Sequence, residues 1–443
     1  MAIVKTKKKN GSRPPKSSRA RKRRLARKQA HLNFEALEPR QLLAAVTVCN
    51  ATDLTNAPDL TSIAALVAND GGDGISLREA ITATNNTTGA NTITFDTSVF
   101  NGEAADVIRL NNTLPLITQS LSIDGGSQNI VISADTDGND TTVPGTFITD
   151  IAASETAGTL ADNTGRVLDI TAGAGETVNL IGLTITGGDQ TGLGGGIING
   201  AGALNVTNSS VSGNRSSLSG GGIFTGTGAV NVTNSTVSGN TVAFQGGGIY
   251  AAAGSNVNLT NSTISGNQAF SGGGLYVYNG ATVTIDNSTI VLNNSTSFIT
   301  TPGGLASLGT TTVNNSIIVG NTSQSGIEPD ISAGPLTSLS GRFNLLGFGD
   351  VQNLGSNNQT GVTFAAAGLG PLADNGGPTQ THALLLDSPA IDAGNSAFTI
   401  ATDQRGLARP VDQANVANAA GGNGSDIGAV EFQEQLGLSL IHI

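Results

Sequence analysis

Residues 205–214 read NVTNSSVSGN, residues 231–240 read NVTNSTVSGN, and residues 258–267 read NLTNSTISGN. Two further copies, TIDNSTIVLN and TVNNSIIVGN, begin at residues 284 and 312. Successive copies start 26 to 28 residues apart, and glycine triplets at residues 194, 220, 246 and 272 keep the same step. A period of this length, rich in β-branched residues, is typical of one coil of a strand-built solenoid. We therefore predict an all-β chain folded as a right-handed parallel β-helix.

Aliphatic residues recur at three positions of this repeat. Stacked coils bring each residue about 4.8 Å above its copy, so we expect three buried columns. Each fully buried member contributes about 1.5–3 kcal/mol. The expected columns are Ile197, Ile223, Ile249 and Leu275; Val206, Val232, Leu259, Ile285 and Val313; and Val211, Val237, Ile264, Ile290 and Ile318.

Asparagine marks the corners between these columns. Val206 and Val211 are five residues apart, so both point inward only if the chain turns between them. Stacked asparagines satisfy turn backbone and bond from coil to coil. The first expected ladder is Asn208, Asn234, Asn261, Asn287 and Asn315, and the second is Asn214, Asn240, Asn267, Asn293 and Asn321.

Composition narrows the class of protein. The chain has 443 residues, of which 12% are charged and 61 are glycine. Its single cysteine, Cys49, excludes an internal disulfide and a cysteine-ligated metal site. No run of 18 apolar residues occurs, so we expect no transmembrane segment. Residues 1–40 carry a net charge of +12 and the remainder carries −23, which separates a basic arm from an acidic body.

The basic arm has two interpretations. It is either a nucleic-acid-binding segment or the positively charged start of an export signal. Residues 34–43, FEALEPRQLL, resemble the LEPR-XLL motif of large exported and surface proteins of planctomycete-type bacteria. The resemblance implies targeting, so we interpret residues 1–48 as a disordered basic targeting region. The acidic body argues against a nucleic-acid partner, because it repels polyanions.

Residues 73–81, DGISLREAI, resemble the CSLREA region that opens many bacterial β-helix surface proteins. Ile75 stands where that motif has cysteine. The resemblance implies an N-terminal cap and first coils at residues 49–120, with the first strand at residues 92–95. A cap is needed because an open end exposes unpaired strand edges and core. The repeats then occupy residues 121–350.

Residues 371–384 read PLADNGGPTQTHAL, and SPAIDAG, DQRG and DIGAVE begin at residues 388, 403 and 426. These motifs resemble the choice-of-anchor Q domain, which precedes a surface anchor in exported bacterial proteins. The resemblance implies such a domain at residues 351–433. Residues 434–443 form a tail whose last six residues, LSLIHI, are similar to a translated transposon end used in sequencing libraries.

The repeats contain few residues of the types that catalysis requires. Polysaccharide-cleaving enzymes need clustered carboxylates and a base. Between residues 178 and 321 the charged side chains are Asp189, Arg215 and Asp286, for which we find no shared repeat position. We therefore expect a protein that is not an enzyme, with no catalytic residues, metal or cofactor.

Two clusters outside the regular coils are candidate sites. His382, Asp392, Asp403 and Arg405 lie in the anchor-like region, where a folding role is favoured. In the segment DTDGND, Asp135, Asp137 and Asp140 have the spacing of a short Ca²⁺ loop. No glutamate follows at the twelfth position, so an acidic surface turn is favoured and calcium binding stays open.

Phe224, Tyr250 and Tyr276 recur at the 26-residue step, each directly after a core aliphatic residue. Strand alternation points them outward, and Tyr278 lies on the same side. Such a stripe either stiffens the sheet by stacking or forms a platform for a sugar chain or partner protein. These four aromatics are the binding residues that we predict.

We therefore expect an exported, monomeric solenoid that is extracellular or at the cell surface. Its repetitive acidic face would serve adhesion, envelope structure or binding of a matrix polymer, with polysaccharides or cell-surface components as partners. The alternative is a degenerate, polysaccharide lyase-like β-helix enzyme, which would show a pocket with convergent carboxylates and a base.

Overall fold

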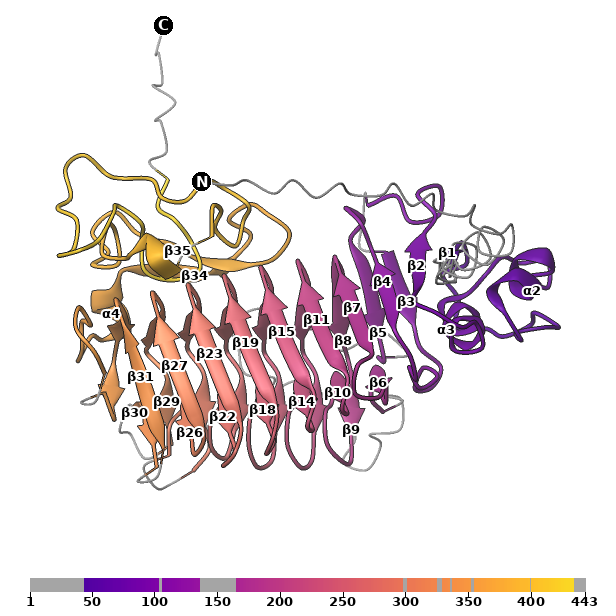
Figure 1. Cartoon of the computed structure of the whole chain (residues 1–443), viewed down its shortest axis with the longest axis horizontal. Coiled ribbons are helices and arrows are strands. Elements are labelled where there is room, and N and C mark those ends of the chain that lie inside the picture. Colours follow the sequence, from indigo (N-terminus) through magenta and orange to yellow (C-terminus); the bar gives the residue numbers. More distant parts are fainter. Residues whose placement is uncertain are drawn as a thin grey trace, which may run out of the picture. The chain divides into compact units, whose positions relative to one another are not determined.

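The computed structural model describes residues 44–102, 106–135, 165–297, 301–324, 329–334, 337–351, 354–398 and 400–433. In these residues the predicted parallel β-helix is confirmed (Figure 1). One regular coil contains four strands, β14 (Ile223–Thr225), β15 (Ala229–Thr233), β16 (Thr236–Ser238) and β17 (Thr241–Val242). Each strand pairs in parallel with its copies in the neighbouring coils, which produces four sheets, here named A to D.

Sheets A and B meet at the asparagine corner. Within the described residues sheet A has ten strands, in spatial order β1 (Ala45–Val48), β2 (Asn91–Phe95), β4 (Leu121–Asp124), β7 (Thr177–Ile181), β11 (Ala203–Thr207), β15, β19 (Asn256–Thr260), β23 (Thr282–Asp286), β27 (Thr310–Asn314) and β31 (Ser338–Arg342). Sheet B has nine in the same part of the chain, β3 (Asp106–Arg109), β5 (Ile130–Ser133), β8 (Leu183–Thr186), β12 (Ser210–Ser212), β16, β20 (Thr263–Ser265), β24 (Thr289–Val291), β28 (Ile317–Val319) and β32 (Leu345–Leu346).

Sheets C and D complete each coil. Eight described strands form sheet C, β33 (Phe348–Gly349), β30 (Pro329–Ala333), β26 (Leu305–Ser307), β22 (Leu275–Val277), β18 (Ile249–Ala251), β14, β10 (Ile197–Asn199) and β6 (Leu168–Ile170). Six two-residue strands, counted over the described ranges, form sheet D, β29 (Thr322–Ser323), β25 (Asn294–Ser295), β21 (Gln268–Ala269), β17, β13 (Arg215–Ser216) and β9 (Asp189–Gln190).

The three predicted aliphatic columns form the core. Register pairs Ile197 with Ile223, Val206 with Val232, and Val211 with Val237. Every member of the three columns is fully buried. The core is thus a stack of aliphatic layers, which explains why the coils need few aromatic residues.

The corner between sheets A and B is a single left-handed residue. Asn208 has φ 50°, and its copies Asn234, Asn261, Asn287 and Asn315 have φ between 46° and 50°. Asparagine tolerates this conformation better than other non-glycine residues. One such residue turns the chain sharply, so Val206 and Val211 both face the interior, as predicted.

Two helices cap the N-terminal end. In α3 (Leu77–Asn85), Ser76 and Glu79 form a capping box, and α2 (Ile63–Ala68) packs beside it. Leu77 and Ile81 are fully buried and close the end of the core. One expectation is wrong here: the first described strand is β1, not residues 92–95. β1 pairs with β2, so part of the segment given to the targeting region belongs to sheet A.

The C-terminal end is covered by the chain itself. Residues 354–362 lie across the last coil, where Leu346 N donates to Gln359 O (2.8 Å) and Gln359 N donates to Asn344 O (2.8 Å). Residues 364–433, here called the C-terminal flank, then fold back. They contain α4 (Phe364–Ala367), the antiparallel pair β34 (Leu369–Ala373) and β35 (Thr381–Leu384), and the 3₁₀ helix η2 (Ser396–Phe398).

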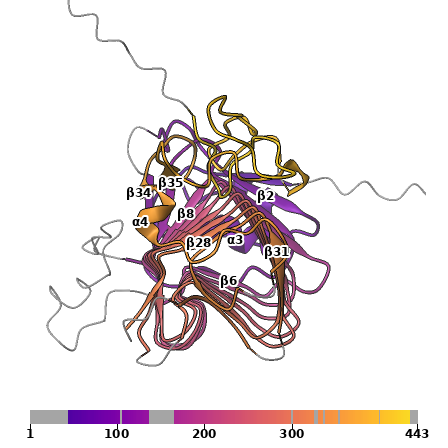
Figure 2. The ribbon, with the colours of Figure 1, turned by 90° about the vertical axis from the view of Figure 1, so that its left-hand side faces the viewer.

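The C-terminal flank packs on the outside of sheet B. Figure 2 looks along the stack of coils, and the flank lies beyond the side that carries β8 and β28. Ile427 and Leu369 of the flank share an apolar cluster with Ile317 and Val291 of sheet B. The flank therefore covers the later coils and leaves the earlier part of the same face uncovered.

Several expectations lie outside the described residues. They are the basic arm with its LEPR-XLL motif, the aspartates at positions 137 and 140, and the tail at residues 434–443. Every described residue belongs to a single compact unit. In the part of the chain that is described, no helix is long and apolar enough to cross a membrane.

Candidate functional site

The outer face of sheet A carries a continuous column of side-chain amides and hydroxyls. Asn205 Nδ2 donates to Asn179 Oδ1 (2.7 Å), and Asn231 Nδ2 donates to Asn205 Oδ1 (2.7 Å). Asn258 continues the column with a bond to Asn231 Oδ1 of 2.8 Å. Register extends the column in both directions, through Ser122, Asn179, Asn205, Asn231, Asn258, Thr284, Thr312 and Ser340.

A second column runs beside the first on the same face. Thr207, Thr233 and Thr260 stand in register with Asp286 and Asn314. Asn314 Nδ2 donates to Asp286 Oδ1 (3.0 Å). Burial raises the pKa of the Asp286 carboxyl, partly offset by this bond. Sheet A therefore presents paired polar columns, which sequence reasoning missed because it considered only the two asparagine ladders at the corners.

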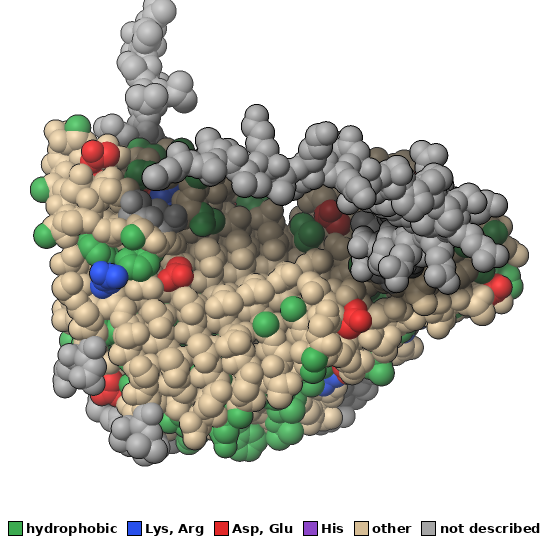
Figure 3. Space-filling view, viewed as in Figure 1, with side chains coloured by type: hydrophobic (Ala, Val, Ile, Leu, Met, Phe, Trp, Pro, Cys, Tyr) green, Lys and Arg blue, Asp and Glu red, His purple; other side chains and the backbone are tan. Residues whose placement is uncertain are grey.

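This face is nearly free of charge and of apolar groups. Figure 3 shows a broad surface of uncharged polar side chains and backbone over sheet A, with isolated charged groups. The expected acidic character does not belong to the regular coils: between residues 178 and 321 the acidic side chains are Asp189 and Asp286. The repetitive face is therefore polar and uncharged, which corrects the expectation of an acidic one.

Asp189 and Arg215 do share a repeat position. They pair in register between β9 and β13, and Arg215 Nη1 lies 3.5 Å from Asp189 Oδ2. The expectation that they share no repeat position is wrong. Two-residue strands have too few residues for alternation to reveal them, although the 26-residue spacing alone could have paired the two side chains.

The predicted aromatic stripe exists as a stack on the outer side of sheet C. Ring centroids lie 5.2 Å apart for Phe224 and Tyr250 and 5.4 Å apart for Tyr250 and Tyr276, with interplanar angles of 7° and 2°. Tyr250 and Tyr276 are only 9% and 7% exposed, whereas Tyr278 is 44% exposed. Burial raises the pKa of the Tyr250 hydroxyl to about 12. Binding through the stripe stays a prediction, with Tyr278 its most accessible member.

A second apolar column escaped the sequence analysis. Leu218, Phe244 and Phe270 are 26 residues apart and lie just after successive strands of sheet D. They are 44%, 55% and 44% exposed. The repeat spacing that revealed the tyrosines would have revealed these residues too.

The histidine and carboxylates weighed in the flank hold the fold together. His382 Nδ1 donates to Gly370 O (2.8 Å), because a carbonyl only accepts, and Nε2 then accepts from Ser265 Oγ (2.9 Å). Burial lowers the pKa of His382. These contacts tie β35 to β34 and to β20 of sheet B.

The other three residues do not join His382. Arg405 Nη2 lies 2.6 Å from Asp403 Oδ2. Asp392 instead accepts from the backbone amide of Gln413 (3.0 Å). Next to them, Arg409 Nε donates to Glu431 Oε2 (2.8 Å) in a fully buried ion pair that sequence reasoning missed. The flank is thus organised around buried ion pairs.

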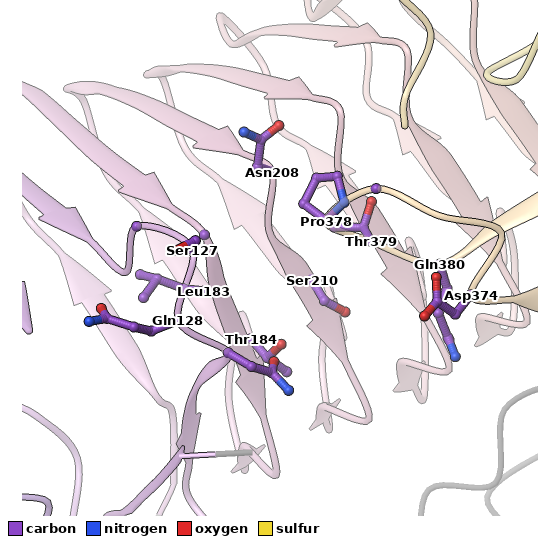
Figure 4. Close-up of a pocket in the computed structure, with 14 residues that line it drawn as sticks. Ser127, Gln128, Leu183, Thr184, Asn208, Ser210, Asp374, Pro378, Thr379 and Gln380 are labelled. Carbon is purple, nitrogen blue, oxygen red and sulfur yellow. The ribbon is translucent and has the colours of Figure 1, made fainter. Parts of the chain in front are cut away.

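Beside the flank lies a cavity of about 610 Å³ (Figure 4). One wall comes from the early coils, with Gln128, Thr184 and Asn208, and the other from flank residues 374–380. Asp374 is the charged residue of the lining, and Pro378 and Leu183 add apolar surface. The cavity holds neither a cluster of carboxylates nor a base.

No metal centre emerges from the part of the chain that is described, where no group of three or more histidine, cysteine, aspartate or glutamate side chains converges. Asp135, the described member of the suggested Ca²⁺ loop, faces Arg109 Nη1 at 3.8 Å. The acidic surface turn favoured for this loop stays a prediction.

The comparisons with known proteins concern the fold. The family model described as a right handed beta helix region matches residues 170–337. The predicted right-handed parallel β-helix is therefore confirmed for the repeats. No curated protein matches the chain.

Among solved structures, the chain is similar to the crystal structure of pectate lyase Pel9A. Identity is 12%, the TM-score is 0.46, and the match covers 88% of this chain and 98% of that chain. This likeness concerns the fold and assigns no reaction. It nevertheless corrects the expectation that the protein is not an enzyme, because that structural neighbour is a lyase.

Proposed function

We propose that the protein works outside the cell, at the cell surface, where the outer face of sheet A binds an extended polysaccharide. The observation that carries the proposal is the column of amides and hydroxyls from Asn179 to Ser340. The seven residues of this row are separated by six steps of about 4.8 Å, so the row is roughly 29 Å long. An open row of this length suits a polymer better than a small molecule.

The chemistry of the face favours an uncharged, hydroxyl-rich polymer. Asn205 and Asn231 present both donors and acceptors, and sugar hydroxyls both donate and accept. Phosphate and carboxylate polymers would call for arginine or lysine, and the coils between residues 178 and 321 contain only Arg215. The LEPR-XLL and choice-of-anchor resemblances support the extracellular location.

Binding to insoluble cellulose and xylan tests this proposal, with polygalacturonate as the acidic comparison. The double variant Asn231→Ala/Asn258→Ala should bind about tenfold more weakly, because each hydrogen bond contributes about 0.5–1.5 kcal/mol and 1.4 kcal/mol corresponds to tenfold. The matched control is Thr241→Ala/Gln268→Ala, which changes two paired residues of sheet D. Equal binding by the two double variants would refute the role of sheet A.

The same mixtures should be assayed for newly formed chain ends. A release of sugar ends that requires the folded protein would show that cleavage accompanies binding. Binding without such release would describe a protein that holds the polymer intact.

A further inference from the structure

The C-terminal flank is held by two columns of side chains on the coils. At the corner column, Asn261 Nδ2 donates to Thr402 O (2.7 Å) and Asn315 Nδ2 donates to Asn395 O (3.3 Å). The outer column of sheet B does the same, since Thr236 Oγ1 donates to Gln380 O (2.6 Å). These columns therefore bind an extended polar chain by regularly spaced side-chain hydrogen bonds.

Both columns continue toward the N-terminal coils, beyond the coils that the flank covers. Asn208 precedes Asn234 at the corner, and Ser210 and Thr184 precede Thr236 in sheet B. Within the described residues none of these three side chains has a hydrogen-bond partner, and all three line the 610 Å³ cavity. The positions whose side chains bind the flank in the later coils are thus open to a ligand in the early coils.

Glycine makes room at this place. Gly182 occupies the corner position one coil before Asn208, with φ 63°, and it lines the cavity. No side chain therefore fills the corner there. The flank residues Pro378 and Gln380 close the opposite side (Figure 4). The volume falls in the range of small-ligand sites, about 300–1,000 Å³, so the cavity suits a few sugar units rather than a long polymer.

The lining selects the chemistry of the ligand. Asp374 brings one negative charge, and the lining contains no arginine, lysine or histidine. An anionic ligand would meet repulsion without a compensating cation. Amides, hydroxyls and one carboxylate together match the hydroxyl groups of a neutral sugar, and Pro378 and Leu183 offer apolar surface to its C–H groups.

A peptide fits this cavity less well. Peptides in extended form gain affinity by adding a strand to a free sheet edge. β8 is paired with β5 and β12, and β12 is paired with β8 and β16, so neither strand offers an edge here. The remaining donors and acceptors are side chains, which suit a ligand with many hydroxyls.

We propose that the cavity between the early coils and the C-terminal flank is a binding site for a short neutral oligosaccharide, separate from the face of sheet A. Asn208, Ser210 and Thr184 bind its hydroxyls, and Asp374 accepts from them. The site is independent of the proposed polymer-binding face, because it lies on the corner and on sheet B.

Calorimetric titration of the full chain with cello-, manno- and malto-oligosaccharides of two to four units tests the proposal. At least one should bind, and Asn208→Gly should weaken that binding at least fivefold. Glycine is compatible with the left-handed corner, as at Gly182, so the variant should keep the fold. Thr184→Val, which replaces a hydroxyl by a methyl group, provides a second variant with the same expected direction.

Two comparisons distinguish this site from the other one. Asn231→Ala/Asn258→Ala should keep oligosaccharide binding while losing polymer binding. Trigalacturonate should bind at least tenfold more weakly than the best neutral ligand. The proposal is overturned if no neutral oligosaccharide binds, if Asn208→Gly and Thr184→Val bind normally, if trigalacturonate binds equally well, or if only a polar hexapeptide binds.

Discussion

Asn267 shows how one side chain links three coils. Its Nδ2 donates to Val237 O (2.9 Å) and to Asn293 Oδ1 (2.9 Å), and its Oδ1 accepts from the backbone amide of Asn240 (3.0 Å). The residue is fully buried. The amide thus satisfies backbone groups of its neighbours where the chain leaves sheet B, which explains why asparagine recurs at this position.

Asn267→Ala should lower the free energy of unfolding by about 3 kcal/mol or more. It leaves the buried amide of Asn240 without its acceptor, at about 1–3 kcal/mol, and it removes the hydrogen bonds from Asn267 Nδ2 to Val237 O and Asn293 Oδ1, at about 0.5–1.5 kcal/mol each. Urea unfolding monitored by circular dichroism measures the loss. Asn258→Ala is the control, because Asn258 bonds on the exposed face of sheet A; its effect should stay within about 0.5 kcal/mol. Equal losses of unfolding free energy in the two variants would contradict this structural role of Asn267.

His382 makes the docking of the flank sensitive to pH. Because burial lowers its pKa below the ordinary 6.5, the folded state favours the neutral ring. This contribution is fully present above about pH 6.5 and is lost as the pH falls through that value toward the lower pKa of the folded state. Amide exchange in β34 and β35, corrected for intrinsic rates, should therefore accelerate between pH 7.5 and 5.5.

His382→Gln is the matched variant for this measurement. Glutamine does not titrate, so the part of the pH effect that depends on His382 should disappear. The same acceleration in the variant and in the original chain would assign the effect to other groups.

At the scale of the coil, the glycine triplets allow neighbouring turns to approach closely. A Cβ on Gly247 would lie 2.6 Å from Gln268 O and would also collide with Gly273 O. Both atoms are backbone, which cannot move aside as a flexible side chain could. The triplets are therefore required by packing between coils, in addition to the left-handed conformation of Gly246.

Gly247→Ala should destabilise the coils strongly and lower the melting temperature well below that of Gly254→Ala. Gly254 has φ 83°, but its added Cβ would meet nothing nearer than Thr227 Cγ2 at 3.8 Å. The second variant thus carries only conformational strain of roughly 1–2 kcal/mol. Thermal unfolding of the two variants compares the steric collision at residue 247 with the conformational strain at residue 254. Similar melting temperatures would contradict the packing argument.

At the same scale, repeat spacing predicted long strands better than short ones. Sheets A, B and C follow aliphatic columns, so their register could be deduced from the sequence. The pairing of Asp189 with Arg215 in sheet D has no apolar alternation to reveal it. β1 was missed because its partner, β2, lies more than forty residues later in the chain.

For the molecule as a whole, docking of the flank combines apolar contacts at the last coils with polar contacts further back. Ile427 is fully buried in the cluster with Ile317 and Val291. Toward the earlier coils the contacts are hydrogen bonds, such as Thr263 Oγ1 to Gln404 Oε1 (2.7 Å). The apolar end should therefore contribute most of the docking energy.

Ile427→Ala should lower the stability of the docked flank by about 2–5 kcal/mol, the usual cost of truncating a buried isoleucine. Hydrogen exchange read out along the chain should accelerate in β34 and β35. Exchange in β11 and β15 should stay unchanged, because coils interact mainly with their neighbours. Uniform acceleration across the chain would mean that flank and coils unfold as one unit.

The candidate sites also differ in how much of each could be predicted from the sequence. The sequence predicted the aromatic stack from its 26-residue spacing, but not that Tyr250 and Tyr276 are largely buried. The polar columns of sheet A were present as repeated letters, yet their outward direction was not used. The cavity could not be predicted, since its walls come from residues 126–129, 182–184, 208 and 210 on one side and 374 and 377–380 on the other, which only folding brings together.

The sequence by itself determined the coil, its three aliphatic columns and its asparagine corners. These features depend on residues one repeat apart, and stacking at a constant strand spacing converts that period directly into contacts. The tertiary structure alone decided where the C-terminal flank docks, which hydroxyls it covers and which it leaves open. Docking depends on shape and hydrogen-bond partners between segments that no period relates, so no local pattern in the chain encodes it.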